Sequence, residues 1–291
     1  MAHKAGFVNI LGNPNVGKST LMNLLVGERL SIITSKAQTT RHRIPGIVNG
    51  ADYQIVFSDT PGILKPNYKL QESMMKFVSG AFEDADIILY ITDVVETFDK
   101  NADFLDRLKN VDIPVIILIN KIDLTNTEKL NTLAELWHET LPKAEILPIS
   151  AISAFNTDRI IPRIVELLPD GPPFYPPDAL TDKPERFFVS EIIREKILLY
   201  YKKEIPYSVE VEIESFKEEE KIIRISAIIY VMRDSQKGIL IGHKGSALKK
   251  TGTEARKALE KFFEKKIFLE LFVKVNKNWR ESDRQLKRFG Y

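Results

Sequence analysis

The feature that most constrains the fold is a glycine-bounded run of eight residues, between an apolar stretch at 7–11 and a helical pattern at 18–26. The run matches the pattern G-x-x-x-x-G-K-[ST]. Its glycines let successive backbone N–H groups face a bound anion, and the helix that follows adds its positive end. The sequence therefore predicts a strand, a phosphate-binding loop (P-loop) and a helix in this order. The predicted phosphate site comprises Gly12, Asn13, Pro14, Asn15, Val16, Gly17, Lys18, Ser19 and Thr20.

The first 180 residues alternate short apolar runs with helical patterns. Several runs are nearly continuous Val, Ile and Leu, which is typical of parallel strands buried on both faces. This alternation predicts a doubly wound α/β domain. Asn49-Gly50 is a hairpin signal within 44–57, so one edge strand should be antiparallel. We expect strands at 7–11, 54–57, 87–91, 115–119 and 145–149, and helices near 18–26, 70–83, 102–109, 127–140 and 158–168.

A proline-rich segment divides the chain. Residues 170–184 contain five prolines, and such a segment continues neither a helix nor a central strand. We expect a first domain at 1–172, a linker at 173–184 and a second domain at 185–291. The second domain shows a helix at 187–203, strands at 208–215 and 221–232, a helix–turn–helix-like stretch at 236–263 and a strand at 266–275. These elements predict a small α+β domain.

A second motif indicates which nucleotide the P-loop binds. Asn120, Lys121 and Asp123 form the pattern N-K-x-D at the end of the predicted strand 115–119, where open α/β sheets bind ligands. A carboxylate at Asp123 can accept hydrogen bonds from N1–H and the exocyclic amine of guanine. Adenine has no such donor pair, so a buried carboxylate there disfavours ATP. The P-loop and the N-K-x-D motif together therefore predict a binding site for GTP or GDP.

Further polar residues complete the predicted site. Asp59 begins the run Asp-Thr-Pro-Gly and fits the role of holding Mg²⁺ through water, together with the Ser19 hydroxyl. Gly62 lacks a Cβ, so its N–H can approach the γ-phosphate. The segment 31–46 has no clear pattern, and Thr39 or Thr40 offers it a hydroxyl for Mg²⁺, so its order should depend on the γ-phosphate. Ser150 and Ala151 follow the last predicted strand and can reach the guanine edge.

The composition and the N-terminal sequence indicate where the protein is located and how its charge is distributed along the chain. The chain has 291 residues, a formal net charge of +2 and no cysteine, which excludes disulfides and thiolate metal sites. With no signal-peptide pattern at its start, we expect a cytoplasmic protein. Residues 1–180 hold 17 Lys and Arg against 22 Asp and Glu, whereas residues 181–291 hold 25 against 18. Such a split favours a polyanionic partner for the second half.

A second glycine-rich loop gives that partner a candidate site. The pattern I-x-I-G-x-x-G at 239–245 joins two predicted helices, and two glycines let a nucleic-acid backbone approach while basic residues neutralise phosphate. A GXXG loop of this kind clamps about four nucleotides. We expect the isoleucines to form part of an apolar floor for unstacked single-stranded bases. The candidate RNA-binding residues are Ile239, Ile241, Gly242, His243, Lys244, Gly245, Lys249 and Lys250.

These motifs together resemble the Era family of ribosome-assembly GTPases, which belongs to the translation-factor class. The resemblance rests on GNPNVGKS, the Thr39-Thr40-Arg41 loop, DTPG, NKID, Ser150-Ala151 and the GXXG loop, and it covers the whole chain. It implies a Ras-like, mostly parallel sheet with one antiparallel edge strand, GTP hydrolysis, and a type II KH domain. It also implies binding to small-subunit ribosomal RNA near its 3′ end, and to the small ribosomal subunit. We expect a monomer.

The mechanism departs from Ras at one position. Ras-type GTPases place a water-orienting glutamine after the Asp-x-x-Gly motif, and here that position is Ile63. Asn15 resembles the P-loop asparagine of potassium-activated GTPases, which suggests that K⁺ acts where an arginine finger would. The expected catalytic groups are Lys18, Asn15, Thr40 and Gly62.

Other functions remain open from the sequence. One alternative is an RNA-binding chaperone in which the nucleotide is largely structural. Another is a regulatory GTPase whose basic tail at 277–291 lies on an anionic membrane, although no lipidation motif supports it. In the tail, Trp279, Phe289 and Tyr291 can stack on bases or pack on the domain. An ATP-dependent kinase is disfavoured by Asp123.

Overall fold

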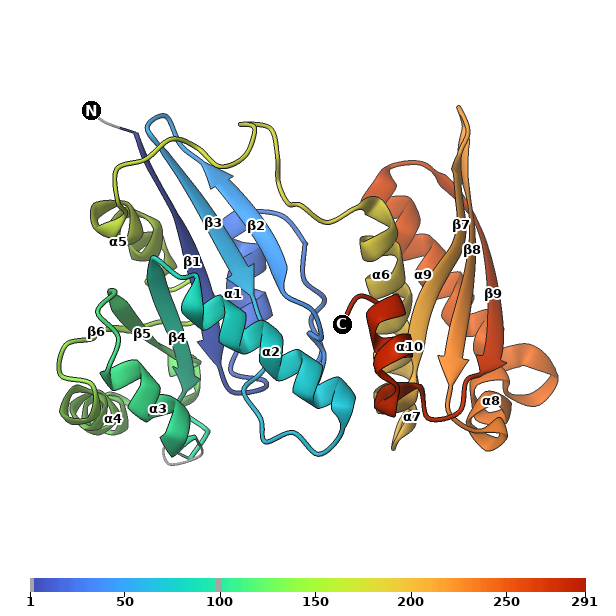
Figure 1. The fold of residues 1–291 in the computed structure, drawn as a ribbon, viewed down its shortest axis with the longest axis horizontal. Coiled ribbons are helices and arrows are strands. Elements are labelled where there is room, and N and C mark those ends of the chain that lie inside the picture. Colours follow the sequence, from blue (N-terminus) through green and yellow to red (C-terminus); the bar gives the residue numbers. More distant parts are fainter. Residues whose placement is uncertain (1–2, 98–100) are drawn as a thin grey trace. The chain divides into compact units, whose positions relative to one another are not determined.

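A computed structural model describes residues 3–97 and 101–291, which form two compact units (Figure 1). The first unit extends through Asp182 and the second starts at Lys183; the short run Asn67–Leu70 groups with the second. The elements of the first unit are β1 (Lys4–Gly12), α1 (Lys18–Val26), β2 (Ile44–Asn49), β3 (Tyr53–Asp59), α2 (Lys69–Glu83), β4 (Ile87–Asp93), α3 (Ala102–Lys109), β5 (Val115–Asn120), η1 (Ile122–Leu124), α4 (Thr127–Thr140), β6 (Glu145–Pro148), η2 (Thr157–Arg159) and α5 (Ile160–Leu167).

The six strands form one sheet in the order β2-β3-β1-β4-β5-β6. All neighbouring pairs are parallel except β2 and β3, which pair antiparallel with Ile44 opposite Asp59. The α/β fold with a single antiparallel edge strand is therefore confirmed. β1 and β4 are almost fully buried, as expected for central parallel strands. Helices α2, α3 and α4 share one hydrophobic core with the sheet, and α2 crosses its front in Figure 1.

The topology brings the predicted motifs to one edge of the sheet. The P-loop follows β1, Asp59 ends β3, Asn120 ends β5, and Ser150 follows β6. Because these strands are parallel, their carboxyl ends lie at the same edge, where open α/β sheets bind ligands. The fold thus supplies one site from segments far apart in the sequence.

The proline-rich segment is bound to the first unit along β2 and β3. The buried Gln54 side chain accepts hydrogen bonds from the N–H groups of Phe174 and Tyr175 at 2.7 and 2.9 Å, and donates to the Tyr175 carbonyl at 2.8 Å. The Ile47 N–H donates to the Leu180 carbonyl at 2.8 Å. We call residues 173–182 the strap. It belongs to the first unit, beyond the domain end expected at 172, because hydrogen bonds with Gln54 and Ile47 hold it to β3 and β2.

The second unit is a three-stranded sheet with helices on one face. Strands β7 and β8 are antiparallel and β8 and β9 are parallel, in the order β7-β8-β9. Side chains of α6, α8 and α9 form one core with this sheet. The predicted helix at 187–203 is α6, which ends at Tyr200. A separate short helix, α7, begins at Ile205, and Pro206 lies in its first turn. The elements are α6 (Glu185–Tyr200), α7 (Ile205–Ser208), β7 (Glu210–Glu218), β8 (Ile222–Val231), α8 (Asp234–Ile241), η3 (His243–Gly245), α9 (Ser246–Phe263), β9 (Lys266–Val275), η4 (Trp279–Glu281) and α10 (Asp283–Arg288).

The C-terminal aromatic residues pack back on the second unit. The buried Trp279 donates from Nε1 to the Ser208 carbonyl at 3.2 Å, and Phe289 packs against it with ring centroids 5.6 Å apart. The Tyr291 hydroxyl donates to Glu210 at 2.9 Å. These rings therefore stabilise the domain, which is the packing alternative of the two that the sequence left open. None of the helices in the described part of the chain is both long and apolar enough to cross a bilayer.

The strap gives a stability prediction. Replacing Gln54→Ala removes three hydrogen bonds to the strap, so the free energy of unfolding of the first unit should fall by about 2 kcal/mol. Limited proteolysis should then cleave the variant faster within 173–182. Asp52→Ala, an exposed position in the preceding hairpin turn, is the control and should behave as the wild type. Equal cleavage rates in the Gln54 variant and the wild type would show that the strap is held by other contacts.

Candidate nucleotide and RNA sites

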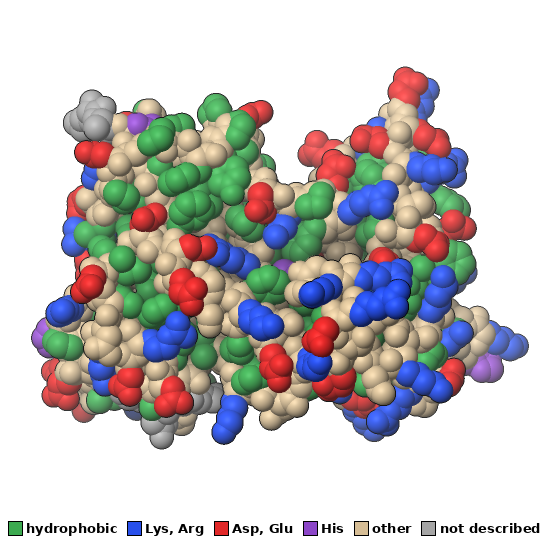
Figure 2. Space-filling view, in the orientation of Figure 1, with side chains coloured by type: hydrophobic (Ala, Val, Ile, Leu, Met, Phe, Trp, Pro, Cys, Tyr) green, Lys and Arg blue, Asp and Glu red, His purple; other side chains and the backbone are tan. Residues whose placement is uncertain are grey.

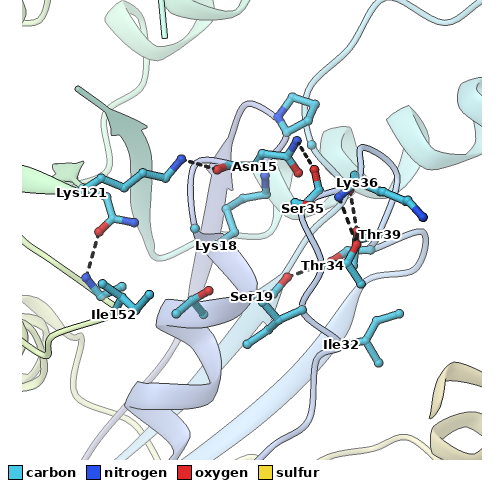
Figure 3. A pocket seen from close by; sticks show the side chains of 18 of the residues that line it. Asn15, Lys18, Ser19, Ile32, Thr34, Ser35, Lys36, Thr39, Lys121 and Ile152 are labelled. Atoms are coloured by element: carbon cyan, nitrogen blue, oxygen red, sulfur yellow. Dashed lines mark hydrogen bonds between the residues drawn. The ribbon is translucent and has the colours of Figure 1, made fainter. Parts of the chain in front are cut away.

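Most of the predicted nucleotide residues line one cavity of about 480 Å³ at the carboxyl edge of the six-stranded sheet (Figure 3). The predicted residues that do not line it are Gly12, Asn13, Val16, Asp59 and Ser150. The P-loop and the start of α1 form one wall, the segment 32–40 forms a second, and the ends of β5 and β6 form a third. Figure 3 shows Asn15, Lys18 and Ser19 on the P-loop side, with Ser35 opposite Asn15 and with Lys121 beside Ile152 at another part of the wall.

The P-loop backbone requires its glycines. Gly12 has φ +149°, and a Cβ there would lie 2.1 Å from the Ile91 carbonyl oxygen. Gly17 has φ +105°, and a Cβ there would lie 2.2 Å from Asn120 Nδ2. Asn120 Nδ2 donates to the Val16 carbonyl at 2.7 Å, so the base motif and the phosphate loop are in direct contact. Another residue type at either glycine would therefore force these walls apart.

Lys18 is buried in the centre of the phosphate site. Its Nζ donates to the carbonyls of Gly12 and Asn13 at 3.0 and 2.7 Å. Burial lowers the pKa of Lys18 to about 8, although the carboxylates of Asp59 and Glu96 act in the opposite direction. The buried ammonium group of Lys18 is therefore poorly hydrated, and it can exchange its two carbonyl partners for phosphate oxygens.

Three oxygen groups converge beside Lys18 and fit a magnesium ion. Ser19 Oγ lies 2.6 Å from Asp59 Oδ2 and 2.9 Å from Thr40 Oγ1, and Thr40 Oγ1 lies 3.2 Å from Asp59 Oδ2. Burial raises the pKa of Asp59, and its Oδ1 has no hydrogen-bond partner within the described chain. Hard oxygen ligands of this kind suit Mg²⁺. Thr39 instead bonds Thr34 and the Lys36 carbonyl, so Thr40 is the threonine at this cluster.

The base end of the cavity is polar at its edge. Asp123 Oδ1 accepts a hydrogen bond from Ser150 Oγ at 2.6 Å, and the Ala151 N–H donates to Asn120 Oδ1 at 2.9 Å. Lys121 Nζ donates to the Asn15 carbonyl at 2.7 Å. The Asp123 carboxylate is therefore oriented by Ser150, as a fixed acceptor for a base requires.

Two apolar residues at the same end were not among the predicted site residues. Leu124 and Ile152 line the cavity and are 65% and 83% exposed. Large apolar side chains at such exposure beside a polar edge suit the flat faces of a purine. The sequence signal was present, because each residue comes directly after a base motif, Asp123 and Ala151.

The position after Gly62 faces the protein core. The Ile63 N–H donates to the Gly12 carbonyl at 3.1 Å, and its side chain is only 9% exposed, within the core that α2 and α3 share. A Cβ at Gly62 would lie 2.6 Å from the Pro14 nitrogen, so the backbone passes directly against the P-loop. The position that holds a glutamine in Ras thus supplies no side chain to the cavity in this chain.

The GXXG loop of the second unit lies between α8 and α9. Gly242, Lys244 and Gly245 have φ of +73°, +49° and +78°. At Gly242 a Cβ would lie 2.6 Å from the Ala247 Cβ. The loop thus turns sharply and exposes its backbone, as an approaching nucleic-acid backbone requires.

A groove of about 370 Å³ adjoins this loop. Ile239 and Ile241 are not among its lining residues, and its apolar lining comes from leucines of α9 and β9. Lys249 lines the groove, whereas Lys250 lies over the Tyr200 ring at 5.0 Å. Figure 2 shows a group of Lys and Arg side chains on the visible face of the second unit. The lining residues are Gly245, Leu248, Lys249, Gly252, Thr253, Arg256, Leu269 and Leu271.

Family models match parts of both units of the chain. A family described as 50S ribosome-binding GTPase matches residues 7–121, and the KH domain matches residues 204–280. GTPase Era of Alkaliphilus metalliredigens strain QYMF is 45% identical over 294 residues, covering 100% of both chains. GTPase Era of Clostridium kluyveri is 46% identical over 290 residues, covering 99% of both. The chain belongs to the GTPase Era family.

Two solved Era structures have the same fold over 99% of both chains, each at 39% identity. One is Era in complex with MgGDPNP and nucleotides 1506–1542 of 16S ribosomal RNA, with a TM-score of 0.95. The other is a single-residue variant of Aquifex aeolicus Era bound to GDP and AlF₄⁻, with a TM-score of 0.94. The two-unit architecture is therefore that of the Era family.

The base site predicts a switch of specificity. In Asp123→Asn the side chain presents a donor where guanine presents its exocyclic amine, so GTP affinity should fall by about a thousandfold. Xanthosine triphosphate carries an oxygen at that position, and its affinity should rise. Competition against a fluorescent guanine nucleotide measures both. Asp112→Asn, outside the cavity residues, is the control. Unchanged GTP affinity in the Asp123 variant would remove this residue from the base site.

Proposed function

We propose that this protein is a cytoplasmic GTP-hydrolysing switch that binds small-subunit ribosomal RNA and acts in assembly of the small ribosomal subunit. The observation that carries the proposal is the single cavity in which the Asp123 edge, the Lys18 amine and the Ser19–Thr40–Asp59 cluster meet. A guanine nucleotide with a bound magnesium ion would use all three of these groups. Its base would meet Asp123, its phosphates would meet Lys18, and its metal would meet the oxygen cluster. The separate GXXG groove supplies the RNA site.

The residues for Mg²⁺ follow from the oxygen cluster. Ser19 and Thr40 would hold the ion directly and Asp59 through water, and the metal would neutralise charge on the β- and γ-phosphates. Lys18 would leave the carbonyls of Gly12 and Asn13 for the phosphates, while the Gly62 N–H lies at the P-loop for the γ-phosphate. A magnesium-bound analogue in a 39% identical Era supports this assignment.

A potassium ion is supported by the position of Asn15. Its Nδ2 donates to the Ser35 carbonyl at 3.1 Å, so the Asn15 amide and a backbone oxygen of the segment 31–46 adjoin the phosphate cavity (Figure 3). An amide and a carbonyl are oxygen ligands that suit a monovalent cation. A cation at this place would add positive charge beside the phosphates to the charge that Lys18 supplies.

The potassium assignment predicts a salt-specific turnover. GTP hydrolysis should be at least tenfold faster in KCl than in NaCl at equal ionic strength, measured by phosphate release. Asn15→Asp should lose this difference, whereas Asn156→Asp, at a turn outside the cavity, should keep it. Equal turnover of the wild-type protein in both salts would overturn the potassium assignment.

The RNA partner is proposed from the groove and from the relatives. The GXXG loop and Lys249 offer backbone approach and positive charge to single-stranded RNA. A 39% identical Era binds nucleotides 1506–1542 of 16S ribosomal RNA, and we propose the corresponding 3′ region as the ligand here. The description of the family that matches residues 7–121 names the 50S ribosome. A large-subunit RNA fragment is therefore the competitor RNA to compare in the same assay.

The GXXG loop predicts a salt-dependent loss of RNA binding when its charge is changed. His243→Asp with Lys244→Asp should weaken binding to a 16S 1506–1542 RNA at least tenfold, and should lower the slope of log K against log salt by about 1. GTP affinity should not change, because the loop lies in the other unit. Lys217→Asp with Lys221→Asp, both exposed on the β7–β8 hairpin, is the control. Equal RNA affinity in the two double variants would place the RNA elsewhere.

A further inference from the structure

A carboxylate outside the five nucleotide motifs lies beside the P-loop. Glu96 Oε2 accepts a hydrogen bond from Asn13 Nδ2 at 2.6 Å, and its Oε1 accepts one from Thr92 Oγ1 at 2.6 Å. Asn13 and Thr92 are both buried. Glu96 itself is half-buried, and these two short hydrogen bonds engage both of its carboxylate oxygens. Glu96 is thereby fixed against the first residue of the loop after β1.

A tight turn after β4 holds this carboxylate in place. Asp93 Oδ1 accepts hydrogen bonds from the N–H groups of Val95 and Glu96 at 2.8 and 2.9 Å. Asp93 Oδ2 pairs with Lys121 Nζ at 2.5 Å, and the same Nζ donates to the Asn15 carbonyl. The turn at Asp93–Glu96 therefore holds the P-loop at two points, the Asn13 side chain and the Asn15 carbonyl.

The backbone explains why a hold on Asn13 matters. Gly12 is the last P-loop residue paired with β4, opposite Ile91, and Pro14 has no N–H with which to anchor the loop. The contact between Asn13 and Glu96 continues the β1–β4 pairing by one residue through side chains. The direction of the following N–H groups, which bind phosphate, depends on where Asn13 is held.

We propose that Glu96 is a positioning residue of the phosphate site, which fixes Asn13 and through it the P-loop N–H groups in the nucleotide-binding arrangement. The proposal deepens the proposed GTPase function and rests on it. Glu96 acts through Asn13 and does not itself contact the phosphates. Its effect is therefore on the affinity for both GDP and GTP, whose β-phosphates use the same N–H groups.

Nucleotide affinity of the full-length protein with Mg²⁺, measured by calorimetry with GDP, tests the proposal. Glu96→Ala should raise the Kd for GDP at least tenfold. Glu96→Gln should stay within about threefold of the wild type, because its amide can accept from Asn13 and donate to Thr92. Asn13→Ala removes this contact and also the hydrogen bond that Asn13 Oδ1 accepts from Asn101 Nδ2, so it should weaken GDP binding at least as much as Glu96→Ala does. Adding Glu96→Ala to Asn13→Ala should weaken GDP binding no further, because the contact between the two side chains is already lost.

The control is Asp103→Ala, an exposed carboxylate on α3, which should bind GDP as the wild type does. Thermal unfolding of each variant without nucleotide separates positioning from stability. Wild-type GDP affinity in Glu96→Ala, with only a lower Tm, would overturn the proposal, as would equal losses in Glu96→Gln and Glu96→Ala. Failure of the wild-type protein itself to bind GDP would instead overturn the proposed function.

Discussion

The nucleotide site depends on one buried side chain, Asn120. Its Nδ2 donates to the Val16 carbonyl at 2.7 Å and its Oδ1 accepts from the Ala151 N–H at 2.9 Å. These bonds join the loops after β1, β5 and β6. The contact requires Gly17, because any Cβ there would lie 2.2 Å from the amide. Loss of Asn120 would leave two buried backbone groups without partners, each costing about 1–3 kcal/mol.

The same edge buries opposite charges. Lys18 and Asp59 are both buried, and desolvation lowers the pKa of the first to about 8 and raises that of the second. This burial opposes the stability of the folded chain. It also makes each charge interact more strongly with a phosphate or a metal than it would in water. The site thus gives up some stability for affinity, as binding sites commonly do.

Local sequence patterns were sufficient to predict the strands and to place the nucleotide motifs at one edge of the sheet. Val- and Ile-rich runs such as 87–91 report burial directly, and Asn49-Gly50 reports its own turn. Contacts between distant segments carry no such pattern. Nothing local indicates that Gln54 binds the strap, or that Glu96 reaches Asn13 across 83 residues. Each of these depends on which strands become neighbours, and that is decided by the whole sheet.

The sequence does not decide between two similar neighbouring side chains, for a related reason. Thr39 and Thr40 are adjacent and chemically equal, and only the path of the segment 31–46 sends Thr40 to Asp59. In the second unit, Ile239 and Ile241 have the expected apolar character, but the groove is closed by Leu269 and Leu271. The alternation of β9 faces these leucines toward α9, which could have been read from the strand once its partner was known.

The position of Ile63 limits how this site can stabilise a transition state. Its side chain belongs to the core, so the charge of phosphoryl transfer must be met by Lys18, by metal ions and by fixed backbone dipoles. Such dipoles act only if they are already oriented, because reorienting them during the reaction would cost the energy that they supply. Two side-chain tethers from one turn after β4, through Glu96 to Asn13 and through Lys121 to Asn15, provide that orientation.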